Sequence, residues 1–232
     1  MLTDPEQDYA TGSIPFLGAT ICLGSRPLIP RSETEYWVEK AIQKITLYGN
    51  GLRSKGIEKP IAVLDLFAGS GAIGVAVLKH VLETHVTFGE LVPSHLSGIE
   101  KTLAVNGIDS SRATLLQTNV WSSVVEVFDF ILANPPYISH ARGTVAPSVT
   151  ASEPHEALFA EDDGFEYIRQ TVLGASRHLA PNGELWIEHE PYQSRRLAEL
   201  AREQGYSVET HLDQYGSGRF SVLACTTPSV VL

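Results

Sequence analysis

Four consecutive residues, Asn134, Pro135, Pro136 and Tyr137, directly follow an apolar, strand-like run at 128–133. Proline has no N–H group, so the carbonyl oxygens around the two prolines are acceptors for which few local donors compete. The side-chain oxygen of Asn134 is a further acceptor, and the two acceptors can converge on one –NH2 group. Tyr137 would supply a flat wall for a planar group. The pattern predicts a clamp that holds an amide or an aryl amine by both hydrogens.

Such a clamp suits methyl transfer to nitrogen. Hydrogen bonds to both hydrogens favour a pyramidal nitrogen, whose lone pair turns toward an electrophilic methyl group. The reaction would be an in-line displacement at a sulfonium methyl, which depends on positioning and electrostatics rather than on a metal or a strong base. We therefore predict no metal site. The alternative for these residues is structural: the prolines end a strand and Tyr137 is packed.

A second candidate site lies in VLDLFAGSGAIG, where Asp65 stands at a strand end and Gly69 and Gly71 precede a helix. Glycines there let the backbone approach a ligand, and the helix N-terminus offers free N–H groups. Glu90, at the end of the next strand, could accept hydrogen bonds from ribose hydroxyls. The spacing matches neither dinucleotide nor phosphate-loop patterns. We therefore predict S-adenosylmethionine, a cofactor with ribose and adenine but no pyrophosphate; a tight turn without a ligand is the alternative.

The elements that must position these residues alternate between strand and helix after about residue 60. This alternation predicts an α/β fold with a doubly wound, mainly parallel sheet and a C-terminal antiparallel strand pair. In such sheets ligands bind beyond the carboxyl ends of the strands. From their apolar spacing, the expected strands are 61–67, 85–90, 113–117, 128–133, 184–190, 206–212 and 219–225, and the expected helices are 70–82, 94–107, 162–179 (ended by a turn at 180–183) and 193–205.

The first 58 residues have a different pattern. We predict a short N-terminal extension, residues 1–58, packed on a core domain formed by 59–232. The extension is expected to contain an extended segment at 13–30 and a helix at 32–49. A stretch rich in glycine and lysine at 49–60 is predicted to be the linker.

Composition narrows the function classes. With 232 residues, 43% of them hydrophobic, the chain can bury one sizeable core. No apolar run approaches the roughly 20 residues of a membrane helix, and the first residues are unlike a targeting peptide. Cys22 and Cys225 suggest neither a disulfide framework nor a cysteine metal site, so we predict a cytoplasmic location. The net charge of −10 weighs against direct nucleic-acid binding without excluding it.

Together these motifs resemble the HemK/PrmC family, the glutamine-N5 methyltransferases of peptide-chain release factors. The resemblance implies the class I methyltransferase fold, S-adenosylmethionine as the cofactor, and the GGQ-loop glutamine of a release factor as the substrate. It is carried in chain order by PLIPRSETEYWVE (27–39), DLFAGSGAIG (65–74), NPPYIS (134–139), EPHEALFAEDDGFEYIR (153–169), LAPNGELWIEHEPYQ (179–193) and DQYGSGRF (213–220).

The resemblance also implies a role for each site residue. Asn134, the carbonyl of Pro135 and Tyr137 would be the catalytic clamp on the glutamine amide, with Pro136, Arg31 and Glu33 as further substrate-side candidates. The cofactor set comprises Asp65 and Asn134, the turn residues Phe67, Ala68, Gly69, Ser70 and Gly71 around the methionine part, Glu90 at the ribose, and Asn119 with Val120 at the adenine.

Four departures from the family pattern stand out. Phe67 occupies a position where the family usually has glycine, so the first part of the turn is expected to approach the cofactor differently. Asn119 replaces a common aspartate, although its oxygen can still accept from the adenine amino group. Ser32 replaces a frequent proline and would form a capping box with Glu35. The helical N-terminal domain that helps to dock the release factor is expected to be absent or vestigial.

Two other functions remain open. An adenine-N6 methyltransferase of DNA or RNA could use the same clamp, because an exocyclic amine presents the same two hydrogens. A non-catalytic scaffold with this fold is the other. Among the remaining residues, we expect Trp37 and Trp186 in the core, Trp121 at the adenine pocket, His189 packed or on the surface, and Asp162 and Asp163 at a helix N-terminus.

Overall fold

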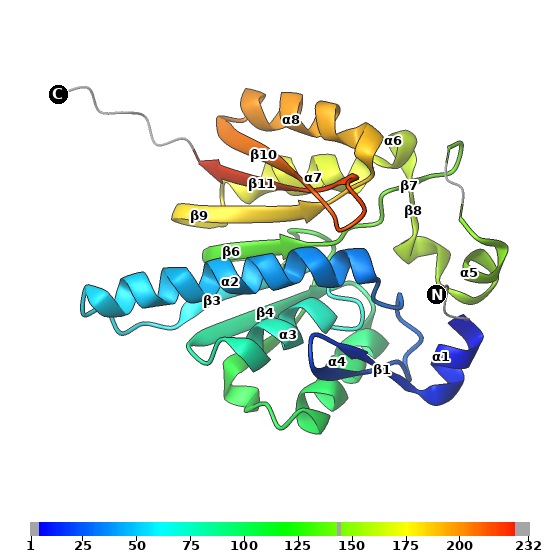
Figure 1. Cartoon of the computed structure of the whole chain (residues 1–232), viewed down its shortest axis with the longest axis horizontal. Coiled ribbons are helices and arrows are strands. Elements are labelled where there is room, and N and C mark those ends of the chain that lie inside the picture. The colour runs from blue at the N-terminus through cyan, green and yellow to red at the C-terminus, as the bar shows by residue number, and fades with distance from the viewer. Residues whose placement is uncertain (1–4, 143–144, 226–232) are drawn as a thin grey trace.

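A computed structural model describes residues 5–142 and 145–225 (Figure 1). Its centre is a seven-stranded sheet in which five strands are parallel and the last two of the chain form an antiparallel pair at one edge. The predicted sheet is therefore confirmed. In spatial order its strands are β10 (Tyr206–Leu212), β11 (Gly218–Cys225), β9 (Leu179–Glu188), β6 (Phe128–Ala133), β3 (Ile61–Leu66), β4 (Thr84–Glu90) and β5 (Ala113–Gln117).

Helices cover both faces of this sheet, because successive side chains of a strand point to opposite faces. In β6, Phe130 and Leu132 belong to one hydrophobic core, whereas Ile131 and Ala133 belong to the other. Trp37 and Trp186 lie in the first core, as predicted. The first core includes side chains of α2 (Ser32–Ser54), α3 (Ala72–His80) and α4 (Pro93–Val105), and the second includes side chains of α7 (Glu166–Ala175) and α8 (Ser194–Glu203).

Smaller elements surround the carboxyl ends of the strands, and α1 lies beside α5 there (Figure 1). Among the helices that the structure describes, none combines the length and apolar character that crossing a bilayer requires. The elements at the carboxyl ends are α1 (Pro5–Thr11), β7 (Ile138–Ser139), α5 (Pro147–Ser152), β8 (Phe159–Ala160), α6 (Glu161–Gly164) and 3-10 turns at His155–Ala157 and Pro191–Gln193. The hairpin strands β1 (Ser13–Phe16) and β2 (Ala19–Cys22) lie beside α3 and α4, and a 3-10 turn at Ser110–Arg112 precedes β5.

The N-terminal segment packs directly on the sheet's helices. The side chain of Asn106, just after α4, exchanges two hydrogen bonds with the backbone of Thr20 in β2, at 3.0 and 2.8 Å. Ile21 of β2 and Ile45 of α2 lie in the same core as Val63 of β3. The division of the chain at residue 58 stays a prediction.

Two local predictions for this segment are wrong. α2 does not end near Gly49 but continues to Ser54, because its last turns rest on the start of β3 and Gly49 faces Ile61 closely. The expected capping box is also absent: Arg31 is the N-cap residue, without a side-chain cap. The carboxylate of Glu35 instead accepts a hydrogen bond of 2.7 Å from the N–H of Leu17 and ties α2 to the β1–β2 hairpin.

The helix expected at 162–179 is shorter in the structure. Asp162, Asp163 and Gly164 have φ angles of 59°, 58° and 78°, which interrupt a helix, and α7 begins only at Glu166. The two aspartates form ion pairs with arginines rather than capping α7. The turn expected at 180–183 lies within β9, where the pairing with β6 is irregular and Asn182 has a φ of 64°.

The strand order reverses beside β3. The chain runs outward from β3 through β4 to β5, and then returns to place β6 on the other side of β3. Ligand sites of doubly wound sheets lie at the carboxyl ends of the strands at this reversal. The predicted cofactor turn follows β3 and the predicted clamp follows β6, so both lie at this point.

The contact between α3 and β4 gives a test of the packing. A Cβ at Gly74 would lie 2.4 Å from the Phe88 ring, whereas a Cβ at Gly51 would meet nothing within 4 Å. Gly74→Ala should lower the free energy of unfolding by about 1–3 kcal/mol through overpacking. Gly51→Ala should raise it by up to about 1 kcal/mol, because alanine favours the helix. Urea unfolding of both variants measures this; equal effects would contradict the packing of α3.

Candidate active site

The register of β6 brings the ends of three strands together. Ala133 pairs with Leu66 of β3 on one side and with Ile187 of β9 on the other. The next residue of each strand segment is Asn134, Phe67 and Glu188 respectively. The predicted clamp therefore lies between the predicted cofactor turn and an acidic residue that ends β9.

A cleft of about 660 Å³ opens over the end of β6. Five predicted substrate-side residues line it together, whereas Pro136 and the predicted cofactor residues other than Asn134 are not among its lining residues. The five are Asn134, Pro135, Tyr137, Arg31 and Glu33. Other lining residues include Leu28, Val145, Val149, Glu188, Glu190, Tyr215 and Arg219.

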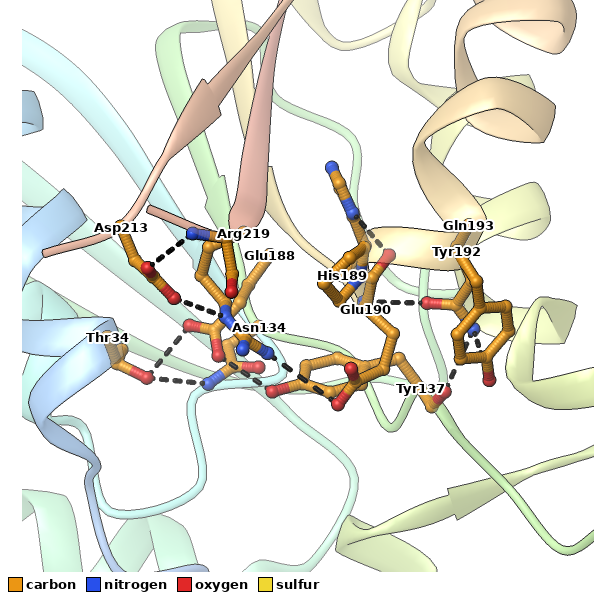
Figure 2. A network of polar contacts seen from close by, with 12 residues as sticks. Thr34, Asn134, Tyr137, Glu188, His189, Glu190, Tyr192, Gln193, Asp213 and Arg219 are labelled. Carbon is orange, nitrogen blue, oxygen red and sulfur yellow. Dashed lines mark hydrogen bonds and ion pairs between the residues drawn. The ribbon is translucent and has the colours of Figure 1, made fainter. Parts of the chain in front are cut away.

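Side chains of the clamp are fixed by a network of polar contacts (Figure 2). Asn134 donates from Nδ2 to the Thr34 hydroxyl at 3.3 Å. The hydroxyl of Tyr137 donates to Glu188 Oε1 at 2.8 Å, and its backbone carbonyl accepts from Gln193 at 2.9 Å. Tyr137 is thus held at its side-chain hydroxyl and at its backbone carbonyl. Burial, together with the charge of Glu188, raises the pKa of the Tyr137 hydroxyl well above its usual value.

Glu188 is the centre of this network. Its side chain is buried, and its Oε2 atom accepts from Trp37 Nε1 at 2.6 Å and from the Thr34 hydroxyl at 2.8 Å. Burial raises the pKa of the Glu188 carboxyl, although hydrogen bonds from Trp37, Tyr137 and Thr34 oppose this. Because both its oxygens accept from named donors, the buried carboxylate is satisfied.

Arg219 of β11 brings positive charge to the same end of the cleft (Figure 2). Its Nε lies 3.2 Å from Asp213 Oδ2, and its Nη1 lies 3.6 Å from Glu190 Oε1. Burial alone would raise the pKa of Asp213, but hydrogen bonds from the N–H groups of Ser217 and Tyr215 and from Arg219 lower it. The guanidinium is therefore balanced by two carboxylates.

Arg31 and Glu33 also line the cleft. Arg31 forms an ion pair with the buried carboxylate of Glu153, which also accepts from the N–H of Ile29 at 3.0 Å. Glu33 accepts a hydrogen bond of 3.0 Å from the Ser32 hydroxyl. The charge of Arg31 is thus already paired within the protein.

At the predicted cofactor end, Glu90 holds the glycine turn. Its Oε2 accepts from the N–H of Gly69 at 2.7 Å, and its Oε1 accepts from the N–H of Val92 at 2.8 Å. His95 Nδ1 lies 3.5 Å from Oε1. Burial would raise the pKa of the Glu90 carboxyl, but His95 and the two N–H groups outweigh it and the pKa is lowered. Glu90 is therefore a carboxylate placed beside the turn.

Asp65 lies beneath the same turn and is fully buried. Its Oδ2 accepts from the N–H of Gly74 at 2.9 Å, whereas Oδ1 has no hydrogen-bond partner among the residues that the structure describes. Burial, and then the charge of Glu90, raise its pKa well above the usual value. A Cβ on Gly69 would meet only the Phe67 carbonyl, at 3.9 Å, so open space faces the turn. A buried acceptor, an open glycine and an acid fit a ligand with hydrogen-bond donors such as ribose hydroxyls.

Phe67 keeps the backbone conformation that a glycine would adopt. Its φ is 64°, in the left-handed region, which costs a non-glycine residue about 1–3 kcal/mol. Its ring packs edge-on against Tyr167 of α7, with the centroids 5.8 Å apart. The substitution therefore changes the side chain next to the turn and leaves the left-handed backbone in place.

The predicted adenine residues follow β5. The N–H of Thr118 donates to the Glu90 carbonyl at 2.9 Å, which places Asn119 and Val120 next to the end of β4. Asn119 is exposed, and Val120 is buried with a left-handed φ of 51°. Trp121 donates to the Gln170 carbonyl of α7. Its predicted place at an adenine pocket stays a prediction.

Sequence reasoning missed Thr34, Glu188 and Arg219. Glu188 could have been recognised from the sequence, because it is an acid at the end of an apolar strand expected to lie in the sheet. Thr34 and Arg219 could not, since a threonine in a first helical turn and an arginine in a hairpin strand are ordinary surface residues. Only the packing of α2 and β11 beside β9 brings them to Glu188.

His189 is packed in the interior and does not face the cleft. Its Nε2 lies 2.8 Å from the Ser221 hydroxyl, and Nδ1 lies 2.9 Å from the Glu190 carbonyl. Burial lowers its pKa from 6.5 to about 4. The fold therefore favours the neutral imidazole.

This pKa predicts a pH dependence of stability. As the pH falls from 6.5 toward 4, the unfolded chain takes up the His189 proton before the folded chain does. The wild type should lose about 3 kcal/mol of unfolding free energy over this range through this group. Chemical unfolding at several pH values should show a shallower loss in His189→Gln, and an identical slope in both proteins would contradict the assignment.

Comparisons with known proteins identify the family and the fold of this chain. Residues 52–153 match the model of the methyltransferase small domain. Release factor glutamine methyltransferases from Streptococcus pneumoniae and Rhodopirellula baltica are 31% and 33% identical to this chain. The alignments cover 93% and 90% of this chain and 73% and 69% of those proteins.

Solved structures show the same fold at low identity. The N-terminal domain of human METTL16 in complex with SAH has a TM-score of 0.61 at 16% identity, covering 91% of this chain and 77% of that one. The ribosomal protein L11 methylase of Lactobacillus delbrueckii subsp. bulgaricus has a TM-score of 0.57 at 17% identity, covering 88% and 82%. With the sheet order and these relatives, the chain belongs to the HemK/PrmC family of release factor glutamine methyltransferases, and it is a class I S-adenosylmethionine-dependent methyltransferase.

Proposed function

We propose that this enzyme methylates the side-chain amide nitrogen, N5, of a protein glutamine, and that this glutamine lies in the GGQ loop of a peptide-chain release factor. The observation that carries the proposal is the Asn134 amide at the cleft. Its nitrogen donates a hydrogen bond to the Thr34 hydroxyl, which leaves its oxygen as an acceptor for a substrate N–H. The names of the relatives support the release factor as the partner, and we place the activity in the cytoplasm with that partner.

In this proposal the chain positions the glutamine and leaves the reacting methyl to the cofactor. S-adenosylmethionine, when bound, supplies an electrophilic methyl group. The oxygen of Asn134 and the carbonyl of Pro135 accept the two amide hydrogens, which favours a pyramidal nitrogen. Tyr137, held by Glu188 and Gln193, provides a fixed wall beside the amide. Such preorganised contacts need not rearrange as the nitrogen attacks.

The residues proposed to hold the cofactor surround the turn after β3. Glu90 would accept from the ribose hydroxyls, and the turn Phe67, Ala68, Gly69, Ser70 and Gly71, together with Asp65, would hold the methionine part. Asn119 and Val120, which follow β5, would contact the adenine. Asp65 Oδ1, which has no hydrogen-bond partner within residues 5–142 and 145–225, and the carboxylate of Glu90 support this assignment.

Charge at the cleft favours an uncharged amide over a nucleic acid. Both arginines that line the cleft, Arg31 and Arg219, are paired with carboxylates. Glu33 and Glu190 add negative charge to the same walls. Phosphate backbones are bound by unpaired basic residues. The adenine methyltransferase therefore remains the second candidate, supported only by the shared chemistry of an –NH2 group.

A labelling experiment tests the acceptor. The enzyme is incubated with methyl-labelled S-adenosylmethionine and, separately, a release factor, a GGQ peptide, and DNA and RNA oligonucleotides. We expect label on the GGQ glutamine, located by peptide mass mapping. Label on adenine would favour the second candidate. The absence of both label and cofactor binding would favour the scaffold.

Asn134→Ala tests the clamp. Removing one positioned polar contact should lower the rate of methyl transfer by about 100-fold or more. The fold should persist, because the side chain is only partly buried. The matched control is Asn50→Ala on the surface of α2, which should keep the wild-type rate. Near wild-type activity in Asn134→Ala would contradict the role assigned to Asn134.

Glu90→Gln tests the cofactor end. Loss of the carboxylate removes charge-assisted hydrogen bonds to the ribose, each worth about 1.5–3 kcal/mol, so the dissociation constant should rise about tenfold or more. Isothermal titration with S-adenosylmethionine measures it. Glu100→Gln, an exposed position on α4, is the control. Unchanged affinity in Glu90→Gln would remove Glu90 from the cofactor site.

A further inference from the structure

One hydroxyl group connects the buried carboxylate to the clamp. Thr34 Oγ1 lies 2.8 Å from Glu188 Oε2 and 3.3 Å from Asn134 Nδ2 (Figure 2). Thr34 comes from the first turn of α2, a hundred residues before Asn134 in the chain. Its side chain is buried between the two. The three groups therefore form a short hydrogen-bond chain from β9 to the cleft.

Which group donates and which accepts in this hydrogen-bond chain follows from the chemistry of the three groups. An ionised carboxylate can only accept, and a hydroxyl has one proton to donate. Thr34 therefore donates to Glu188, and its oxygen must accept from its other neighbour. Only the nitrogen of the Asn134 amide can donate to it. Nitrogen and oxygen of an amide have nearly the same shape, so the polarity of the partners decides the orientation.

The carboxylate end of the chain is itself fixed. Trp37 Nε1, which can only donate, holds the same Oε2 atom at 2.6 Å, and the Tyr137 hydroxyl holds Oε1. Glu188 is 1% exposed and Trp37 is 0% exposed. Turning the Thr34 hydroxyl away would remove a hydrogen bond from a buried charged group, which is costly. The orientation is therefore set from the protein interior outward.

We propose that Glu188 and Thr34 are positioning residues that set the orientation of the Asn134 amide, so that its oxygen rather than its nitrogen faces the substrate. The inference rests on the proposed function, in which that oxygen accepts from the amide to be methylated. In the opposite orientation Asn134 would present N–H groups to an –NH2 group, and two donors cannot form a hydrogen bond. Both residues act through Asn134.

Glu188→Gln keeps the direction of the hydrogen-bond chain. Because Trp37 Nε1 can only donate, the glutamine turns its oxygen toward Trp37 and Thr34 and its nitrogen toward the Tyr137 hydroxyl, which can accept. Thr34 then still donates to residue 188, so this variant does not turn the Asn134 amide. Thr34→Val removes the connection altogether, whereas Thr34→Ser restores the hydroxyl.

Steady-state kinetics of methyl transfer, with the methyl acceptor identified for the wild type, tests these variants. We expect kcat to fall by about 10- to 100-fold in Thr34→Val, the scale of losing one positioned polar contact. Thr34→Ser should recover most of the wild-type kcat, and the dissociation constant of the cofactor should not change. Glu184→Gln, earlier in β9 and paired with Lys44, is the matched control. Wild-type kcat in Thr34→Val would overturn the proposal.

A double-mutant comparison separates orientation from general damage. Asn134→Asp places an oxygen at both positions, so its acceptor no longer depends on the hydrogen-bond chain. Adding Thr34→Val to Asn134→Asp should therefore cause little further loss of kcat. An equal fold-loss in both backgrounds would show that Thr34 acts through general structure, and would overturn the proposal.

A spectroscopic measurement tests the hydrogen-bond chain without requiring a methyl acceptor. In 15N-labelled protein, the side-chain amide signal of Asn134, assigned by its loss in Asn134→Ala, should move in Thr34→Val. It should stay in place in Thr34→Ser and Glu184→Gln. A signal that stays in place in Thr34→Val would overturn the hydrogen-bond chain. A wild type that transfers no methyl to any glutamine, while this signal moves as expected, would overturn the proposed function alone.

Discussion

Burying the Glu188 carboxylate imposes the constraint on which the clamp depends. A buried charge must be matched by donors, and Glu188 takes them from Thr34, Trp37 and Tyr137. These donors come from α2 and from the segment after β6, so satisfying one carboxylate joins elements that are distant in the chain. The segment before the sheet is thereby part of the site. Its helix supplies contacts that the sheet alone could not provide.

Several strained backbone positions lie around the carboxyl ends of the strands. Phe67 after β3 and Val120 after β5 have left-handed φ angles, and so do Asp162 and Asp163 next to the clamp. Such conformations are unfavourable for residues with side chains and persist only where the surroundings hold them. Phe67 is held by Tyr167, and Asp163 by Ser139 and Arg142. The stability of the two cores offsets strain at the turns that shape the site.

The arginine side chains at the cleft are paired with carboxylates of the protein itself. Arg219 faces Asp213 and Glu190, and Arg31 faces Glu153. A neutral carboxamide needs hydrogen-bond acceptors at short range and gains little from a strong field. Paired charges also hold the walls of the cleft in place, because each arginine connects two separate segments. This agrees with a reaction governed by positioning.

The sequence by itself determined the sheet and the motifs at the strand ends. A continuous apolar run, as at 130–133, indicates a strand that is covered on both faces, and Pro135 and Pro136 must end that strand. Glu90 and Gly69 were likewise identifiable, because the end of a parallel strand is a fixed place in this kind of sheet.

Tertiary structure decided what depends on partners far away in the chain. α2 continues past Gly49 because Ile61 packs there, and Asp162 leaves the helix to meet Arg196. Thr34 is separated from Glu188 by 154 positions, so no local pattern could connect them. Local propensities act over a few residues, whereas the burial of a charge is settled only when all its neighbours are in place. The orientation of Asn134 belongs to this second group.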